Sequence, residues 1–367
     1  MCASINKEQL KISRVAFFSD SLAERNGTGA YYFDLIDSLK KELPTIEIFQ
    51  PLRNVRFSRL SVPMPGDPSQ RLITPNLLRI RNGLKKLKPN IIVIVTPGPF
   101  GIVGFLYAKK HKINCITAFH TDFAQLTKIY WNPLSRFFAN LYLKFINKCL
   151  CKNSQYTLIN NSKLISDIKN LGSVNYKLMG TPLPQYFLDI PKKNLPSKIK
   201  QICFAGRLAL EKNIDLIINS AKDFPSIMFI IIGEGPLRCE LIRKAKDLKN
   251  VKFMNWLNRK ELVNIIDLSS ALLLPSKIET FGSIAYEAMA RGRPVIVSTS
   301  SGINQWENLA AHILKMETSS DLSRCIQSLI DMTDSERAKL SQNSYLAARD
   351  FHEESIKQWI KLLTTNL

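Results

Sequence analysis

Two short motifs in the second half of the chain constrain its fold more than any other feature. The first runs from Gly206 to Lys212 and follows the apolar run Ile202 to Ala205. The second runs from Glu279 to Glu287 and leads, through a glycine and a proline, into the β-branched run Val295 to Val297. Each motif lies where a strand is expected to pass into a helix. This alternation is typical of a parallel sheet covered by helices.

The same alternation runs along the whole chain of 367 residues, of which 45% are apolar. β-branched runs predict strands at 15–19, 46–49, 91–95, 113–118 and 156–159, and again at 202–205, 228–232, 251–253, 271–274 and 295–297. Between the two series lies the proline-rich segment 181–196, which predicts a linker. We therefore expect an α/β protein with Rossmann-like domains at residues 1–185 and 186–344, and a final helix at residues 345–367.

The residue types in the two motifs suit a ligand that carries a diphosphate and hydroxyl groups. Arg207 and Lys212 supply two cations after a strand. Gly282 allows close backbone approach, and the amides at the start of the next helix favour phosphate. Glu279 before that helix and Glu287 on its second turn can accept hydrogen bonds from hydroxyl groups. Each motif alone is also typical of a turn or of solvated carboxylates, but together they predict a nucleotide-sugar site.

The pattern Gly-Arg-x-x-x-Glu-Lys, followed by Glu, seven residues and Glu, resembles the retaining glycosyltransferases of family four. The resemblance runs, with gaps, over nearly the whole chain. It implies the GT-B fold, in which two Rossmann-like domains border a cleft and the last helix crosses back to the first domain. It also implies hexosyl transfer from a nucleotide diphosphate sugar.

The resemblance implies a role for each matching residue. Arg207 and Lys212 would hold the donor diphosphate and stabilise it as it leaves. Glu279 would contact the transferred sugar, and Glu287 would bind the ribose. Further donor contacts would come from the start of the helix, namely Phe281, Gly282 and Ser283.

The first half of the chain supplies two further candidates. Gly27 and Gly29 stand between the first strand and the first helix, where backbone amides can reach a diphosphate across a cleft. His120 follows the strand 113–118, and the resemblance places a catalytic histidine there, near the sugar and the acceptor. A strand-end histidine with a packing role is the alternative.

Positive charge is concentrated in the first half. The net charge is +21; residues 1–185 carry 26 Lys and Arg against 10 Asp and Glu, whereas residues 186–367 carry 25 against 20. Nine of these cations lie between Pro51 and Lys88. Such a patch attracts an anionic bilayer by roughly 1 kcal/mol per cation near the surface. A solvated basic surface is the alternative, and nucleic acid ranks lower because no nucleic-acid motif accompanies the charge.

The segment from Trp131 to Lys148 places aromatic and aliphatic residues between cations. It is compatible with a helix that lies in a membrane interface, but we expect a core helix whose other face is cationic. The region 87–148 resembles glycolipid-forming family members, such as sulfoquinovosyl-lipid and phosphatidylinositol mannosyltransferases. This resemblance favours a lipid acceptor.

These features together predict a retaining hexosyltransferase that uses a UDP- or GDP-linked sugar and a membrane lipid or lipid-linked glycan as acceptor. A soluble acceptor and a catalytically degenerate sugar-nucleotide-binding subunit are the alternatives. We expect neither a metal nor a cofactor, because no Asp-x-Asp motif stands in the right place and two cations can neutralise the leaving charge. The sequence leaves the donor base, the sugar and the linkage open.

Cysteine usage and hydropathy bear on location. The seven cysteines follow neither zinc-type spacing nor a disulfide framework. No apolar run approaches the ~20 residues of a membrane span, and the N-terminus lacks the apolar run of a signal peptide. We therefore expect a cytoplasmic protein, peripheral at the inner face of the membrane and without a nucleic-acid partner.

Overall fold

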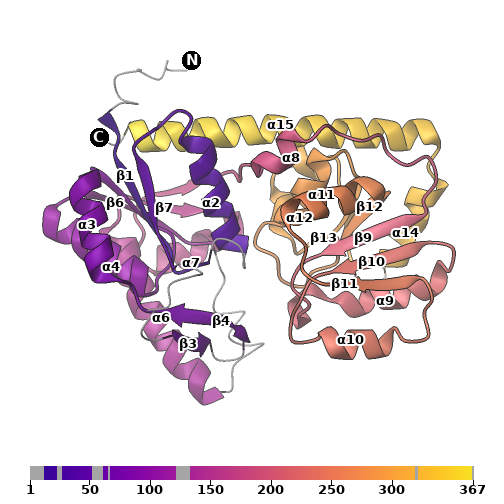
Figure 1. Cartoon of the computed structure of the whole chain (residues 1–367), viewed down its shortest axis with the longest axis horizontal. Coiled ribbons are helices and arrows are strands. Elements are labelled where there is room, and N and C mark those ends of the chain that lie inside the picture. Colours follow the sequence, from indigo (N-terminus) through magenta and orange to yellow (C-terminus); the bar gives the residue numbers. More distant parts are fainter. Residues whose placement is uncertain are drawn as a thin grey trace. The chain divides into compact units, whose positions relative to one another are not determined.

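The computed structural model describes residues 12–22, 27–51, 61–64, 67–120, 133–318 and 321–365. The chain divides into two compact units (Figure 1). The first unit takes the chain up to Pro182 and from Glu353 onward, and the second takes Leu183–His352. Each unit contains a six-stranded sheet of its own.

The sheet of the first unit has the strand order β2-β1-β5-β6-β7-β8, and all of its neighbouring strands are parallel. Its strands are β1 (Val15–Phe18), β2 (Ile46–Phe49), β5 (Ile91–Ile94), β6 (Asn114–Ala118), β7 (Tyr156–Ile159) and β8 (Tyr176–Leu178). The helices of this unit include α2 (Gly27–Leu39), α3 (Leu77–Leu87), α4 (Pro99–His111), α6 (Pro133–Asn153) and α7 (Ile165–Asn170). A separate antiparallel pair consists of β3 (Ser61–Met64) and β4 (Asp67–Ile73).

Helices cover both faces of this sheet, as the near-continuous apolar strands require. Val15 and Phe17 point into a buried cluster that includes side chains of α2. Ala16 and Phe18 point to the opposite face, where they meet buried side chains of α3, α4 and α6. The two-residue period of a strand thus divides β1 between two cores.

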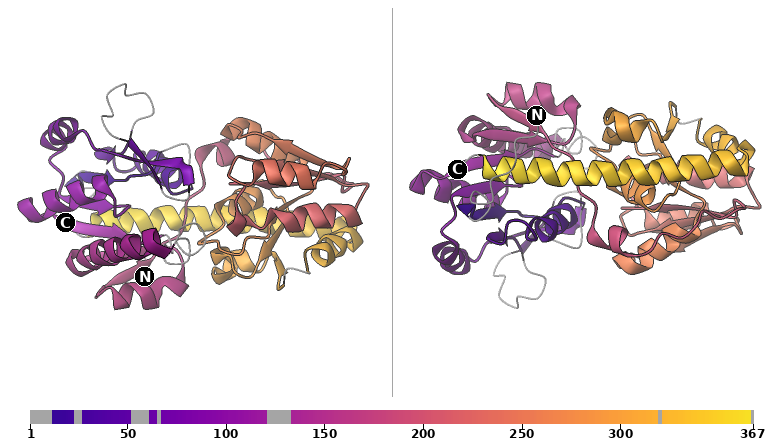
Figure 2. Two further views of the ribbon diagram at one scale, coloured as in Figure 1. Left: turned by 90° about the horizontal axis from the view of Figure 1, so that it is seen from below. Right: turned by 90° about the horizontal axis from the view of Figure 1, so that it is seen from above.

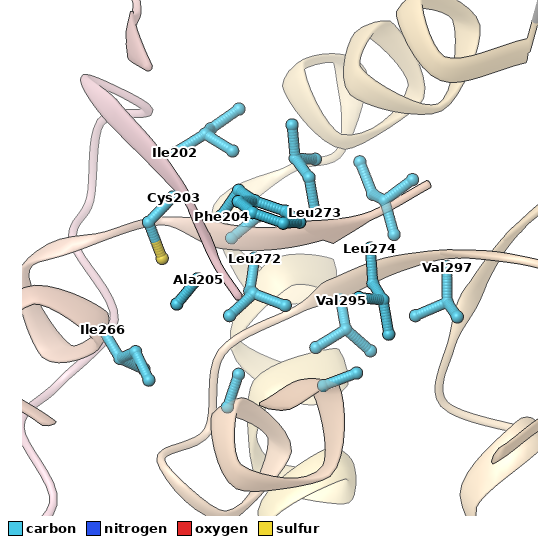
Figure 3. Packing of buried hydrophobic residues seen from close by; sticks show 14 of the residues in the cluster. Ile202, Cys203, Phe204, Ala205, Ile266, Leu272, Leu273, Leu274, Val295 and Val297 are labelled. Atoms are coloured by element: carbon cyan, nitrogen blue, oxygen red, sulfur yellow. The ribbon is translucent and has the colours of Figure 1, made fainter. Parts of the chain in front are cut away.

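The sheet of the second unit is also parallel, in the order β11-β10-β9-β12-β13-β14. Its strands are β9 (Gln201–Ala205), β10 (Met228–Ile232), β11 (Val251–Met254), β12 (Ala271–Leu274), β13 (Val295–Ser298) and β14 (Leu314–Met316). The main helices around it are α8 (Gln185–Asp189), α9 (Ile214–Asp223), α10 (Arg238–Lys244), α11 (Arg259–Leu268), α12 (Ser283–Ala290), α13 (Glu307–Ala310) and α14 (Asp321–Asp331). Figure 3 shows side chains of β9, β12 and β13 packed together in the core.

The prediction of two Rossmann-like α/β sheets is confirmed, and every predicted strand is present to within one residue at each end. The sequence analysis missed β8 and β14, which are three-residue strands at sheet edges, and the β3–β4 pair. Short edge strands bury little surface, so they carry weak apolar patterns. The burial of β8 shows this, because none of its three residues is fully buried.

The last helix, α15 (Asp334–Thr364), is longer than the predicted 345–367 helix and begins well before it. Thr333 explains the early start: its hydroxyl accepts from the Glu336 amide, and Glu336 accepts from the Thr333 amide in return. Figure 2 shows α15 as one unbroken helix. Its final turns carry Trp359 and Leu363, both fully buried in the core of the first unit.

Two buried arginines fasten the segment after α8 to the body of the second unit. Arg291 forms an ion pair with Asp267 at 2.7 Å and donates to the carbonyl oxygens of Ile190 and Pro191. Arg293 donates to the carbonyl oxygens of the nearby residues Lys193 and Asn194. Much of the proline-rich segment is therefore held by side-chain hydrogen bonds despite its lack of regular structure.

The interpretation of 131–148 as a core helix is wrong for most of α6. Ile146 and Leu150 are buried, but the aromatic side chains on the opposite side, among them Phe138 and Phe145, are exposed. Apolar periodicity identified the helix correctly, yet it could not tell which of two apolar faces packs on the sheet. Within the described ranges, no helix is both long and apolar enough to cross a bilayer.

Candidate functional site

The first motif begins in a turn that the backbone holds tightly. After β9, the Gly206 amide donates to Ile232 O and the Leu208 amide donates to Glu234 O. A Cβ atom on Gly233, which has φ +140°, would lie 1.9 Å from Gly206 O. This close approach requires glycine and fixes the turn that carries Arg207.

Lys212 lies at the end of a short 3-10 helix, η2 (Leu210–Lys212). Its Nζ donates to Glu279 Oε2 at 2.5 Å, and the two side chains are only 19% and 15% exposed. The Lys277 amide also donates to the carbonyl oxygen of Glu211 at 2.8 Å. The first motif therefore contacts the second through side chains, and it contacts the residues just before the second through the backbone.

Arg207 extends the same cluster of charges. Its guanidinium lies 3.7 Å from the Glu211 carboxylate, which is buried. This contact joins the loop after β9 to η2. A neighbouring carboxylate of this kind orients a cation and lowers the cost of holding it in a partly buried place.

The second motif forms the start of α12, as predicted. Gly282 precedes the helix with φ +104°, a conformation that favours glycine. Ser283 is the first helical residue and Glu287 lies on the second turn. The amides of the first turn point out of the helix, which makes its N-terminus attractive to an anion.

The loop after β13 braces this helix start. The Gly302 amide donates to Glu279 O, and the Ile303 amide donates to Phe281 O at 2.7 Å. Ser301 Oγ donates to the same Phe281 carbonyl at 3.0 Å. The ring of Phe281 is buried. The loop thus holds the backbone that leads into Gly282.

His120 lies in the first unit, two residues after β6, and is almost fully buried. Its Nε2 is 2.6 Å from the Tyr32 hydroxyl. Burial lowers the pKa of His120 to about 4, although a hydrogen bond with Asn160 opposes the shift. Burial also raises the pKa of Tyr32. The imidazole is therefore neutral at physiological pH and can accept a hydrogen bond from the tyrosine.

One expectation needs correction. Gly27 and Gly29 were expected between the first strand and the first helix, but both lie in the first turn of α2. A glycine pair that follows a strand is compatible with either arrangement.

The loop Gly233-Glu234-Gly235 follows β10, abuts the first motif and was not among the predicted site residues. A Cβ atom on Gly235 would lie 2.4 Å from Leu208 O. Two glycines in three residues directly after a strand were a recognisable signal of close backbone approach. In the described part of the chain, no group of three or more His, Cys, Asp or Glu residues has the arrangement of a metal site.

Comparison with known proteins assigns both halves of the chain. The family model described as glycosyl transferases group 1 matches residues 187–347, which include both motifs. The model described as glycosyltransferase family 4 matches residues 25–160. Together the two models match residues in both halves of the chain, and both describe glycosyltransferases. The resemblance read from the motifs is thereby confirmed.

The individual relatives of this chain are distant. The alpha-monoglucosyldiacylglycerol synthase of Acholeplasma laidlawii is 26% identical over 237 residues, which are 58% of this chain and 60% of that protein. For the first curated relatives that it matches, the chain spans between about a quarter and three fifths of their length.

Solved structures confirm the GT-B fold. Sucrose-phosphate synthase from Thermosynechococcus elongatus superimposes with a TM-score of 0.73 at 16% identity, over 95% of this chain and 98% of that one. HepE from Anabaena, in complex with UDP-glucose, gives a TM-score of 0.68 at 15% identity, over 96% and 100%. At such identities the likeness concerns the fold alone.

Proposed function

We propose that this protein is a retaining glycosyltransferase that transfers a hexose from a UDP- or GDP-linked sugar to a lipid acceptor. The observation that carries the proposal is the 2.5 Å contact between Lys212 and Glu279, which joins the two motifs beside the N-terminus of α12. A cation, a carboxylate and a set of backbone amides at one place suit a diphosphate attached to a sugar.

In the proposed reaction, the bond between the sugar C1 and the diphosphate oxygen breaks while a bond from C1 to the acceptor oxygen forms on the same face. The acceptor proton passes to the departing diphosphate. Negative charge grows on the diphosphate in the transition state, and Arg207 and Lys212 stabilise it electrostatically. These cations take the part that a divalent metal would otherwise play, so activity is expected to survive chelation by EDTA.

Two carboxylates bind the parts of the donor other than the diphosphate, and each binds a different part. Glu279, fixed by Lys212, faces the sugar hydroxyls, and Glu287, on the second turn of α12, accepts from the ribose diol. Main-chain contacts come from Phe281, Gly282 and Ser283. His120, neutral because it is buried, serves the sugar and the acceptor as a hydrogen-bonding group rather than as a cation.

A lipid acceptor is supported by the relatives and by the charge of the first unit. The Acholeplasma relative is named for a glycolipid product, and residues 1–185 hold most of the net charge of +21. On α3, the described cations that face solvent are Arg79, Arg81, Lys85 and Lys86, followed by Lys88 at the helix end. We propose reversible attachment to the anionic inner face of the membrane. Of the other cations in this run, Arg71 lies in β4, and Arg53, Arg56 and Arg59 lie outside the described residues.

The division of roles between the carboxylates gives the test. Glu287→Gln should weaken the binding of bare UDP or GDP, whichever the wild type binds, in calorimetry, because the ribose contact is lost. Glu279→Gln should leave the bare nucleotide unaffected and weaken the intact sugar nucleotide. Glu240→Gln, on exposed α10, is the matched control and should change neither.

Two outcomes would count against this assignment. Equal effects of Glu279→Gln and Glu287→Gln on both ligands would mean that the roles are wrongly divided. Wild-type protein that binds neither UDP nor GDP, with or without a sugar, would remove the donor site itself.

A further inference from the structure

Helix α6 carries an apolar stripe on the side that faces away from the sheet. Its members recur at the spacing i, i+3, i+4, i+7, i+8 and i+11, which places them on one face of a helix. They are Leu134, Phe137, Phe138, Leu141, Tyr142 and Phe145. Five of them are between 59% and 71% exposed, and Tyr142, at the edge of the stripe, is 46% exposed and donates its hydroxyl to Pro97 O at 2.9 Å.

The opposite face of α6 packs on the sheet. Ile146 and Leu150 are buried in the cluster that joins α6 to the sheet, and Leu143 lies at intermediate exposure between them in the helical sequence. Packing on the sheet therefore does not account for the exposed stripe. Single exposed apolar side chains are ordinary, but a continuous row of large ones marks an interaction surface.

Cations border the stripe. Lys144 and Lys148 are exposed along one edge, and Lys152 continues the line of the stripe beyond its aromatic part. Helix α3, with its row of exposed cations, covers the same face of the sheet as α6, because both contribute to one buried cluster. Figure 1 shows both helices in the first unit. An apolar stripe with flanking cations is the pattern of a helix that lies in a membrane interface.

We infer that the stripe of α6 inserts into the headgroup and acyl boundary of an anionic bilayer. The cations of α3 and α6 attract the bilayer, and the aromatic side chains hold the protein there after contact. This inference rests on the proposed lipid acceptor, and it names the surface that brings the enzyme to it. Cations on two helices together with an aromatic stripe complement an anionic bilayer in both charge and hydrophobicity.

The two contributions respond differently to salt, which allows them to be separated. Attraction between charges fades as the screening length falls from ~10 Å at 0.1 M to ~3 Å at 1 M salt. Insertion of apolar side chains persists. Binding that survives high salt and depends on the stripe is therefore the signature of insertion.

The experiment measures sedimentation of the full chain with vesicles of phosphatidylglycerol and phosphatidylcholine at low and high salt. The stripe variant combines Phe137→Ser, Phe138→Ser and Phe145→Ser. The charge variant combines Arg79→Gln, Lys85→Gln and Lys86→Gln. The control, Ile242→Ser with Leu268→Ser, removes two exposed apolar side chains from the second unit.

We expect the stripe variant to lose on the order of 100-fold in vesicle partitioning, and Phe138→Ser alone on the order of 10-fold, because each inserted ring loses part of its transfer free energy. The charge variant should bind less than wild type at low salt and equally at high salt. The control should match wild type throughout. Unfolding midpoints should not change, because the substituted side chains are exposed.

Three results would overturn the inference. The first is wild-type partitioning by the stripe variant. The second is loss of all wild-type binding at high salt. The third is a wild-type oligomer in solution that the stripe variant abolishes while vesicle binding is unchanged, which would assign the stripe to a second copy of the chain. Nucleotide binding by the same samples is measured in parallel, so failure of the donor site is recognised separately.

Discussion

At the scale of single residues, the candidate donor site depends on a contact between two side chains of opposite charge. Lys212 and Glu279 are both largely removed from solvent, so each limits the freedom of the other. A lysine held in this way is positioned before charge develops on a ligand. Such preorganisation gives electrostatic groups their catalytic value.

Lys212→Ala should lower kcat by roughly 30- to 1000-fold, which corresponds to ~2–4 kcal/mol of lost transition-state stabilisation. The fold should be retained, because the side chain is not part of the hydrophobic core. Transfer of labelled sugar in single-turnover assays measures the effect. Lys222→Ala, at the exposed end of α9, is the control. A kcat near that of wild type for Lys212→Ala would refute the leaving-group role.

His120 gives a prediction for pH dependence. Its pKa is about 4 in the folded protein, against an ordinary value of 6.5 for a histidine side chain in water. As pH falls, the unfolded chain therefore takes up this proton first, so the contribution of His120 to stability is full above about pH 6.5 and is lost toward about pH 4. The difference in urea unfolding free energy between wild type and His120→Gln should change over this window, by at most ~1.4 kcal/mol per pH unit. Parallel pH profiles of the two proteins would contradict the assignment of a buried neutral imidazole.

At the scale of elements, the loops after β9 and β10 form one backbone unit. The glycines of the second loop leave room for the carbonyl groups of the first, and hydrogen bonds run between them. The position of Arg207 is therefore decided partly by a loop that contains none of the predicted donor-site residues. A substitution in the loop after β10 should therefore alter the position of the loop after β9.

Gly233→Ala should destabilise the protein by roughly 2–4 kcal/mol, because the new methyl group meets a carbonyl oxygen and because φ +140° is unfavourable for alanine. Donor affinity should fall as well. Chemical unfolding and nucleotide calorimetry measure the two effects. In Gly206→Ala, by contrast, the methyl group lies 3.2 Å from a ring carbon of Phe204, and the loss of stability should be distinctly smaller. Equal stabilities of the two variants would show that the loops are not coupled in this way.

The sequence predicted elements well where a short apolar run or a motif of fixed spacing defines them, and it failed where it had to decide which face of a helix is buried. The central strands are buried on both faces and were found to within a residue. The start of α12 was found because Gly282 and Glu287 have distinct chemistry at fixed spacing. Helix α6 was misassigned because both of its faces are apolar. The burial of Arg291 and Arg293 could not be predicted, since their partners are carbonyl groups about a hundred residues away.

At the scale of the whole molecule, the first unit is built from two separate stretches of chain. Trp359 is fully buried against Phe17 and Tyr32, with ring centroids 6.2 and 6.1 Å away, and its Nε1 donates to the Tyr31 hydroxyl at 3.1 Å. The ring of Tyr32 also contacts His120. The final turns of α15 therefore support the side chains that position the histidine.

Trp359→Ala should cost ~3–5 kcal/mol of unfolding free energy, as expected for removal of a fully buried indole. It should also lower transfer activity, because Tyr32 loses a packing partner. Leu346→Ala, an exposed position on the same helix, should change stability by less than ~0.5 kcal/mol. Thermal and urea unfolding of both variants provide the measurement. Equal stabilities would indicate that the last turns of α15 do not belong to the core of the first unit.

The divided construction of the first unit has a consequence for the order of events on the ribosome. The second unit, Leu183–His352, is continuous, and all of it is synthesised before Trp359 is added. Domains usually fold in the order in which they are translated. Here, however, the first unit lacks the Trp359 indole from its core until the whole of the second unit has been synthesised. Nascent chains stalled before α15 ends should therefore hold a protease-resistant second unit and a first unit that is still open to cleavage.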